Sequence, residues 1–405
     1  YSEFLVGTLS LRIISSAASI MTGLVLSKLI HTKTSSYILT SLFLLLYTFT
    51  PGFIQQAHFG TTESLLTLFL VLIVYFDKRV LIQAILVGLA AATKPSGILF
   101  GVFPLYFLIA RGLGEKTSPL RDSIIIVAIV GIVTLLFSPH YLLHFKDFWQ
   151  TFLYESALAR GSIEVFYTEQ FRNTIPMAFQ LTKIFPYALG LPVSLISLFG
   201  LVQSIPLLSL FLYFSFLYVK WTRFIVPISV LMLYFGFLGL HKKTSITFIT
   251  VITVITVLYQ IFIGTRFMNL YTQKDVRITA SEWINKNLPQ GSRILSESAN
   301  VFDLPLTNNR EFKVTYLFLY DKTSLPTLNN FDYVIIPSRR VFKNYYQKNK
   351  NAVIDAYYDV IFDKRRFKLV KQFSVLDPSD EEAEETWSVF DHPVVRVYRR
   401  IADSY

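Results

Sequence analysis

The feature that most constrains this sequence is a succession of long apolar runs. Runs of about 14 to 27 residues recur up to about residue 264 and are separated by short polar turns. A helix of about 20 residues crosses a bilayer core, whereas the strands of a soluble core are much shorter. The composition agrees, because 53% of the residues are hydrophobic and only 16% are charged. The sequence therefore predicts an α-helical integral membrane protein.

We expect about ten membrane spans within residues 1–271 and a soluble α/β domain over residues 272–405. Two of the spans are shorter than a perpendicular crossing needs, so a re-entrant pair remains an alternative for them. These two are Glu63–Phe76 and Val80–Thr93. The other expected spans are Phe4–Ile30, Ser36–Ile54, Ser96–Ala110, Ser123–Ser138, Tyr187–Gln203, Ile205–Val219, Phe224–Leu240 and Thr244–Gly264.

Charge in the connecting loops predicts which face of the membrane each loop occupies. Alternate loops are rich in cations, and by the positive-inside rule these loops are cytoplasmic. The stretch 139–186 and the C-terminal domain then fall on the non-cytoplasmic face. The stretch 139–186 is aromatic and lacks an apolar run, which predicts interfacial helices. The cationic loops carry His31 and Lys33, Asp77-Lys78-Arg79, the loop 111–121 and His241-Lys242-Lys243.

The C-terminal part has the patterns of an ordinary soluble domain. Ala280–Asn287 has helical character and is followed by the stop Pro289-Gln290-Gly291. Asp332–Ile336 and Val394–Tyr398 have the character of strands. The acidic run Asp377–Glu385 has no apolar period, which predicts a solvated loop.

Several classes of chemistry are excluded. The chain has no Cys, so it has neither disulfides nor thiolate metal sites. The net charge of +11 is not arranged as a basic stripe with interleaved aromatic residues, so we expect no nucleic-acid partner. Neither G-x-G-x-x-G nor a P-loop string is present, so no nucleotide cofactor is expected.

Several strings in the chain resemble one family. The segment His58-Phe-Gly-Thr-Thr-Glu63-Ser-Leu-Leu, followed by Gly88-Leu-Ala-Ala-Ala-Thr-Lys94-Pro-Ser-Gly97, resembles the protein O-mannosyltransferase branch of the GT-C glycosyltransferases. The bacterial phospholipid-carrier-dependent glycosyltransferases are the most similar members. The other matching strings are Gly161-Ser162 with Tyr167 to Gln170, Val219-Lys220-Trp-Thr-Arg223-Phe-Ile-Val-Pro227 and Val389-Phe-Asp-His-Pro393.

The resemblance implies a hexosyl- or mannosyltransferase-like enzyme of a prokaryotic plasma membrane. It would transfer a sugar, with inversion, from a polyprenyl-phosphate carrier to a hydroxyl of a protein, lipid or glycan on the non-cytoplasmic face. The family's catalytic Asp lies in a loop ahead of a span that resembles Phe4–Ile30, so we expect it to precede residue 1. A chain without that loop is expected to be inactive. Glu63 stands where the family has an acidic residue that is usually Asp.

Such a reaction needs a carboxylate base and cations that stabilise the departing phosphate. Lys94, Lys220 and Arg223 lie at expected span ends on the outer face and are candidates for binding the donor phosphate. The alternative is that they are cations that reach the headgroups without a catalytic part. Arg12, inside the first span, either binds the donor or pairs with the loop ahead of residue 1.

Further residues are candidates for lining the site. His58 and Glu63 could share a divalent metal only if His58 lies in a loop, and Glu63 could simply cap a helix. Tyr167, Glu169 and Gln170 would position the sugar or acceptor, or else order an interfacial helix.

Two other functions remain open. A transporter or flippase of lipid-linked sugars would need polar groups near the bilayer midplane, whereas the candidates here gather at one surface. The other is a non-catalytic membrane protein that binds a glycan through its soluble domain.

Overall fold

The computed structural model describes residues 2–112, 119–298, 303–306, 311–320, 325–347 and 351–401, so residues 113–118 of an expected inner loop lie outside it. The chain forms two compact units. The first consists of Tyr1–Ser162 and Ile175–Thr265, and the second of Ile163–Thr174 and Arg266–Tyr405. The expected boundary at residue 271 therefore lies close to the second junction, but the short segment Ile163–Thr174 was not expected in the soluble part.

The first unit is helical. Its elements are α1 (Ser2–Thr34), α2 (Tyr37–Thr48), α3 (Pro51–His58), α4 (Glu63–Tyr75), α5 (Val80–Thr93), η1 (Pro95–Gly101), α6 (Val102–Gly112), α7 (Pro119–Phe137), α8 (His140–Leu143), α9 (Phe145–Arg160), η3 (Gln180–Ile184), α10 (Phe185–Ala188), α11 (Leu191–Leu201), α12 (Ile205–Phe216), α13 (Thr222–Lys243) and most of α14 (Ile246–Thr272).

The expectation of about ten spans is wrong. Each expected range contains a helix, but among the described residues only α1, α13 and α14 are long and apolar enough to cross a membrane. The total rises to five if the bent pairs α2 with α3 and α11 with α12 each count as one span. The reason is length: α4 and α5 have 13 and 14 residues, which at 1.5 Å per residue reach about 20 Å of a ~30 Å core.

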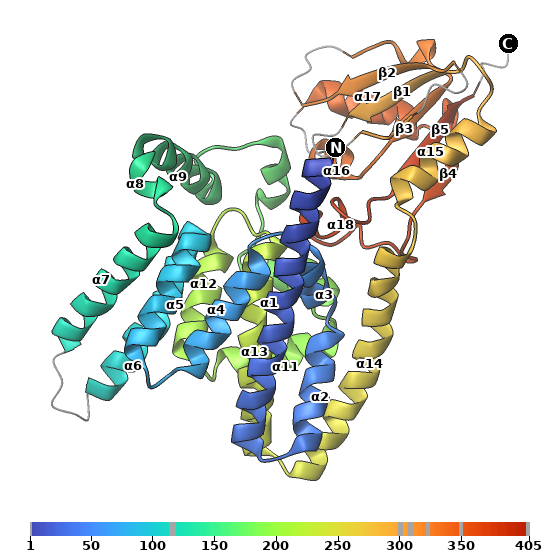
Figure 1. Cartoon of the computed structure of the whole chain (residues 1–405). Helices are drawn as coiled ribbons and strands as arrows, with labels where there is room; N and C mark the ends of the chain where they lie inside the picture. The colour runs from blue at the N-terminus through green and yellow to red at the C-terminus, as the bar shows by residue number, and fades with distance from the viewer. Residues whose placement is uncertain are drawn as a thin grey trace. The chain divides into compact units, whose positions relative to one another are not determined.

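The helices of the first unit pack through small residues. Figure 1 shows α4 between α1 and α5, with α7 against α5. α11 and α13 approach most closely at two glycines: a Cβ on Gly200 would lie 1.9 Å from the carbonyl oxygen of Met232, and one on Gly236 would lie 1.9 Å from that of Ile196. Such backbone contact is typical of helix packing in membranes. Exposed apolar side chains such as Ile255 and Phe262 on α14 are likewise consistent with a membrane environment.

The second unit is a small α/β domain. Its elements are η2 (Phe166–Phe171), α15 (Val276–Asn287), β1 (Arg293–Ser298), β2 (Lys313–Phe318), η4 (Leu328–Asn330), β3 (Tyr333–Ile336), α16 (Arg340–Tyr345), α17 (Ala352–Phe362), β4 (Phe367–Phe373), α18 (Glu385–Ser388) and β5 (Val395–Arg400).

The five strands form one sheet in the order β2-β1-β3-β5-β4 (Figure 1). The first three are parallel, and β5 pairs antiparallel with both β3 and β4. Alternate residues of β1 enter two different cores: Leu295 packs with Tyr358 of α17, and Ile294 packs with Ala280 of α15. Both faces of the sheet are therefore covered. The expected helix and the two expected strands are confirmed to within a few residues.

The acidic run Asp377–Glu385 is only in part the solvated loop that its composition predicts, because Asp377 and Glu382 are exposed but the last residues of the run are buried. Glu384 and Glu385 are 0% and 1% exposed. The carboxylate of Glu385 lies 2.5 Å from Nε of Arg340 and accepts a hydrogen bond from the side chain of Asn344. The acidic segment therefore packs onto the basic residues of α16. Its partners are distant in sequence, so local composition could not reveal them.

Candidate functional site

The centre of the site in the first unit is a salt bridge between Glu63 and Lys94. Glu63 is the first residue of α4, and Lys94 is the residue that follows the end of α5. The Lys94 Nζ donates to Glu63 Oε1 at 2.9 Å. The side chain of Thr61 also hydrogen-bonds to the Glu63 carboxylate. The start of α4 and the end of α5 thus lie side by side and place opposite charges next to each other.

Arg223 joins this pair from a distant part of the chain. It lies in the first turn of α13 and interacts electrostatically with Glu63. Its guanidinium carbon lies 4.3 Å from the ring centroid of Trp221 and 5.8 Å from that of Phe224. Lys94 Nζ lies 5.6 Å from the same Phe224 ring. Phe224 is therefore a shared neighbour of the two cations, which carry more positive charge than the one carboxylate neutralises.

The backbone after α5 fixes the position of Lys94. Lys94 is extended, and the N–H of Gly97 donates to its carbonyl oxygen at 2.7 Å. A Cβ on Gly97 would lie 2.3 Å from the carbonyl oxygen of Ala90, so only glycine fits this turn. The Gly in the string Ala-Thr-Lys-x-Ser-Gly thus has a structural reason.

Two other predicted phosphate ligands do not join the salt bridge. Lys220 is buried between α12 and α13, where its Nζ donates to the carbonyl oxygen of Tyr218 at 3.0 Å. Burial lowers the pKa of its amino group. Arg12 is exposed on α1. Its backbone runs beside the loop ahead of Glu63, because a Cβ on Gly60 would lie 3.3 Å from the Arg12 nitrogen.

His58 is the last residue of α3 rather than part of a loop. It is half-buried and lies five residues before Glu63. Among the described residues, no three His, Cys, Asp or Glu side chains come close enough together to hold a metal ion.

Tyr167, Glu169 and Gln170 belong to η2, which is part of the second unit. Gln170 makes two hydrogen bonds with the acidic segment: its amide nitrogen donates to Glu384 Oε1 at 2.9 Å, and its oxygen accepts from the backbone N–H of Glu385 at 3.0 Å. The Tyr167 ring lies 5.6 Å from the guanidinium carbon of Arg340. Glu169 pairs with Arg172 at 3.3 Å. These contacts order the second unit.

The aromatic residues that flank the cations had no predicted role. Trp221 and Phe224 contact the charged groups that were singled out, and the alternation in Lys220-Trp-Thr-Arg223-Phe was the available signal. Arg340 was also missed, since nothing near it in sequence indicates a buried ion pair.

No family model, curated protein or solved structure matches this chain. The resemblance to the O-mannosyltransferase branch therefore rests on the strings quoted above alone.

Proposed function

We propose that this protein is a membrane glycosyltransferase that takes its sugar from a polyprenyl-phosphate carrier. The observation that carries the proposal is the salt bridge of Glu63 with Lys94, together with Arg223, which lies near the same Phe224 ring as Lys94; the three residues come from separate segments of the chain. All three lie in strings that resemble the lipid-dependent transferases. A bound lipid phosphate would supply the negative charge that this cluster lacks.

The reaction is the one that the resemblance implies. The acceptor hydroxyl attacks the anomeric carbon from the face opposite the phosphate, and a carboxylate base takes its proton. The bond between the anomeric carbon and the phosphate oxygen breaks, so polyprenyl phosphate leaves with the bonding electrons. Lys94 and Arg223 stabilise the charge that develops on that oxygen. Glu63 holds Lys94 in position by the salt bridge, and the resemblance implies an Asp as the base.

The position of the cluster favours an enzyme over a transporter. A transporter would gather polar groups near the middle of its helices. Here Glu63 and Arg223 each lie in the first turn of a helix, and Lys94 lies just after the end of one. Chemistry at helix ends suits a lipid whose reactive group lies at the headgroup level.

The test is sugar transfer by membranes containing the full-length gene product, supplied with labelled polyprenyl-phosphate sugars. We expect label to leave the carrier, and we expect Arg223→Ala and Glu63→Gln each to slow its release at least about tenfold. Lys242→Gln is the matched control, since Lys242 lies in the last turn of the same helix as Arg223. Absence of transfer from every carrier, or equal loss in the control, would refute the proposal.

A further inference from the structure

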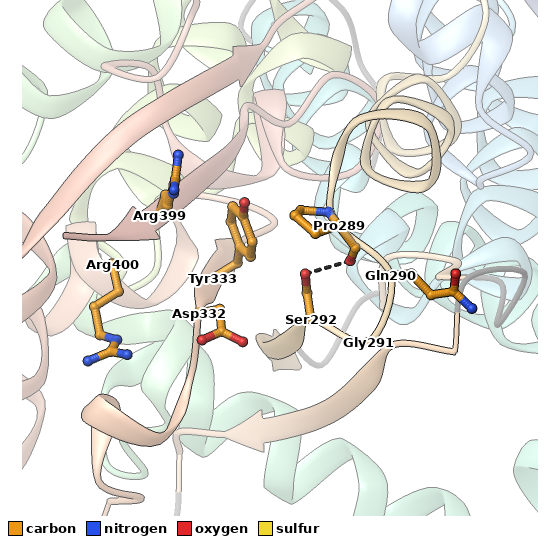
Figure 2. Close-up of a pocket in the computed structure, with 8 residues that line it drawn as sticks. All are labelled: Pro289, Gln290, Gly291, Ser292, Asp332, Tyr333, Arg399 and Arg400. Carbon is orange, nitrogen blue, oxygen red and sulfur yellow. Dashed lines mark hydrogen bonds between the residues drawn. The ribbon is translucent and has the colours of Figure 1, made fainter. Parts of the chain in front are cut away.

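The second unit contains a cavity of about 370 Å³ at the edge of its sheet (Figure 2). One wall is the loop Pro289–Ser292, which follows α15. The other is formed by the start of β3 and the end of β5, through Tyr333 and Arg399 with their chain neighbours. The volume lies within the range of small-ligand pockets.

Strand register places two of the lining side chains, Tyr333 and Arg399, in one row with Lys368 of β4. Tyr333 pairs with Arg399 across β3 and β5, and Arg399 pairs with Lys368 across β5 and β4. Directly opposite residues of antiparallel strands lie on the same face of the sheet. Figure 2 shows Tyr333 and Arg399 on the same side of the strands as Pro289, with Asp332 and Arg400 on the other. The row therefore faces the loop.

The charges in this row are unbalanced. Arg399 and Lys368 are both exposed, and neither forms a salt bridge with another described residue. Like charges directly opposite in a sheet destabilise it. The carboxylate in the cavity lining is already engaged, because Asp332 accepts from the side chain of Arg293 at 2.8 Å and from its backbone N–H at 2.9 Å. An anion would relieve the repulsion.

We propose that this cavity binds a small organic anion of monosaccharide size. Its carboxylate or phosphate group lies against Arg399, beside Lys368, and its neutral part fills the space between Tyr333 and the loop Pro289–Ser292. The planar guanidinium of Arg399 can donate two hydrogen bonds to either group. Anion binding here does not depend on the transfer reaction; the choice of sugars as probes rests on the proposed function.

The experiment is titration calorimetry of the intact protein in detergent at low ionic strength. The probes are glucuronate, glucose 6-phosphate, inorganic phosphate and neutral glucose, so the arms separate a carboxylate from a phosphate and an anionic sugar from a free anion. We expect at least one acidic sugar to bind about tenfold more tightly than glucose. Arg399→Gln and Lys368→Gln should each weaken that binding about tenfold or more.

Arg365→Gln is the matched control, because Arg365 is exposed in the same unit and pairs with Asp363. This variant should bind as the wild type does. The proposal is overturned if no acidic sugar binds more tightly than glucose, if inorganic phosphate alone binds, or if Arg399→Gln is indistinguishable from the control. Since no arm measures sugar transfer, failure here leaves the proposed reaction intact.

Discussion

The side chain of Glu63 is more deeply buried than that of its partner Lys94. In their salt bridge the side chain of Glu63 is 6% exposed, whereas that of Lys94 is 27% exposed. A lysine can swing its amino group toward water on its flexible stem. A glutamate held in the first turn of a packed helix has less freedom to do so. The carboxylate therefore depends on its partner more than the amino group does.

This asymmetry predicts that Lys94→Gln destabilises the protein more than Glu63→Gln does. The lysine variant leaves a buried carboxylate without its hydrogen-bonded counter-ion and with only the more distant Arg223, which costs up to roughly 3 kcal/mol, while the other variant leaves an amino group that can hydrate. The double variant should be more stable than Lys94→Gln alone. Thermal unfolding in detergent measures all three. Equal losses for the two single variants would show that the pair is not the buried centre described here.

His392, in the second unit, is a buried histidine whose pKa is raised. Burial alone would lower its pKa, but the carboxylates of Asp391 and Asp380 outweigh burial and raise the pKa to about 9. The folded protein thus keeps a proton on His392 that the unfolded chain gives up near its usual pKa of ~6.5. The protonated His392 therefore stabilises the folded protein fully below pH ~6.5. This stabilisation is lost as the pH rises through about 9.

Unfolding of the intact protein between pH 6 and 9.5 should therefore reveal this histidine. The pKa difference corresponds to about 3 kcal/mol over the interval. Burial also raises the pKa of Glu297 to about 8, so this group too makes the protein less stable as the pH rises toward 8. The effect of His392 is therefore isolated by comparing the wild type with His392→Gln. We expect the variant to lose stability less steeply with rising pH. Parallel pH profiles would contradict the assigned charge.

At the scale of elements, the sequence predicted helices well and their lengths poorly. The helices of the first unit coincide with the apolar runs, because apolar periodicity is a local property. The number of spans was overestimated, because an apolar run shows that a segment avoids water and not that it is long enough to cross a membrane. Pro51, the first residue of α3, and Pro206, the second residue of α12, mark two of the breaks.

The sequence could predict those site residues that are charged and lie at the end of an apolar run. Glu63, Lys94 and Arg223 were chosen as polar residues at the ends of apolar runs, and the structure brings them together. Lys220 has the same pattern but donates to a backbone carbonyl, which no sequence pattern distinguishes. Tyr167 and Gln170 contact residues more than 170 positions away, so their partners depend on tertiary packing alone.

At the scale of the whole molecule, the second unit is assembled from two stretches of chain. Ile163–Thr174 leaves the first unit, packs with residues after 265 and returns. Gln170 anchors this insertion through its two hydrogen bonds to Glu384 and Glu385. A change of composition near residue 272 indicates only the later boundary, because the insertion is too short to have a composition of its own.

The central claim is that the cluster of Glu63, Lys94 and Arg223 receives the phosphate of a lipid. The most direct measurement compares the binding of polyprenyl phosphate with that of polyprenol, which lacks the phosphate, to the protein in detergent. We predict at least about tenfold tighter binding of the phosphate form, lost in Arg223→Gln and kept in Lys242→Gln. Equal binding of the two lipids, or a preference that survives Arg223→Gln, would contradict the claim.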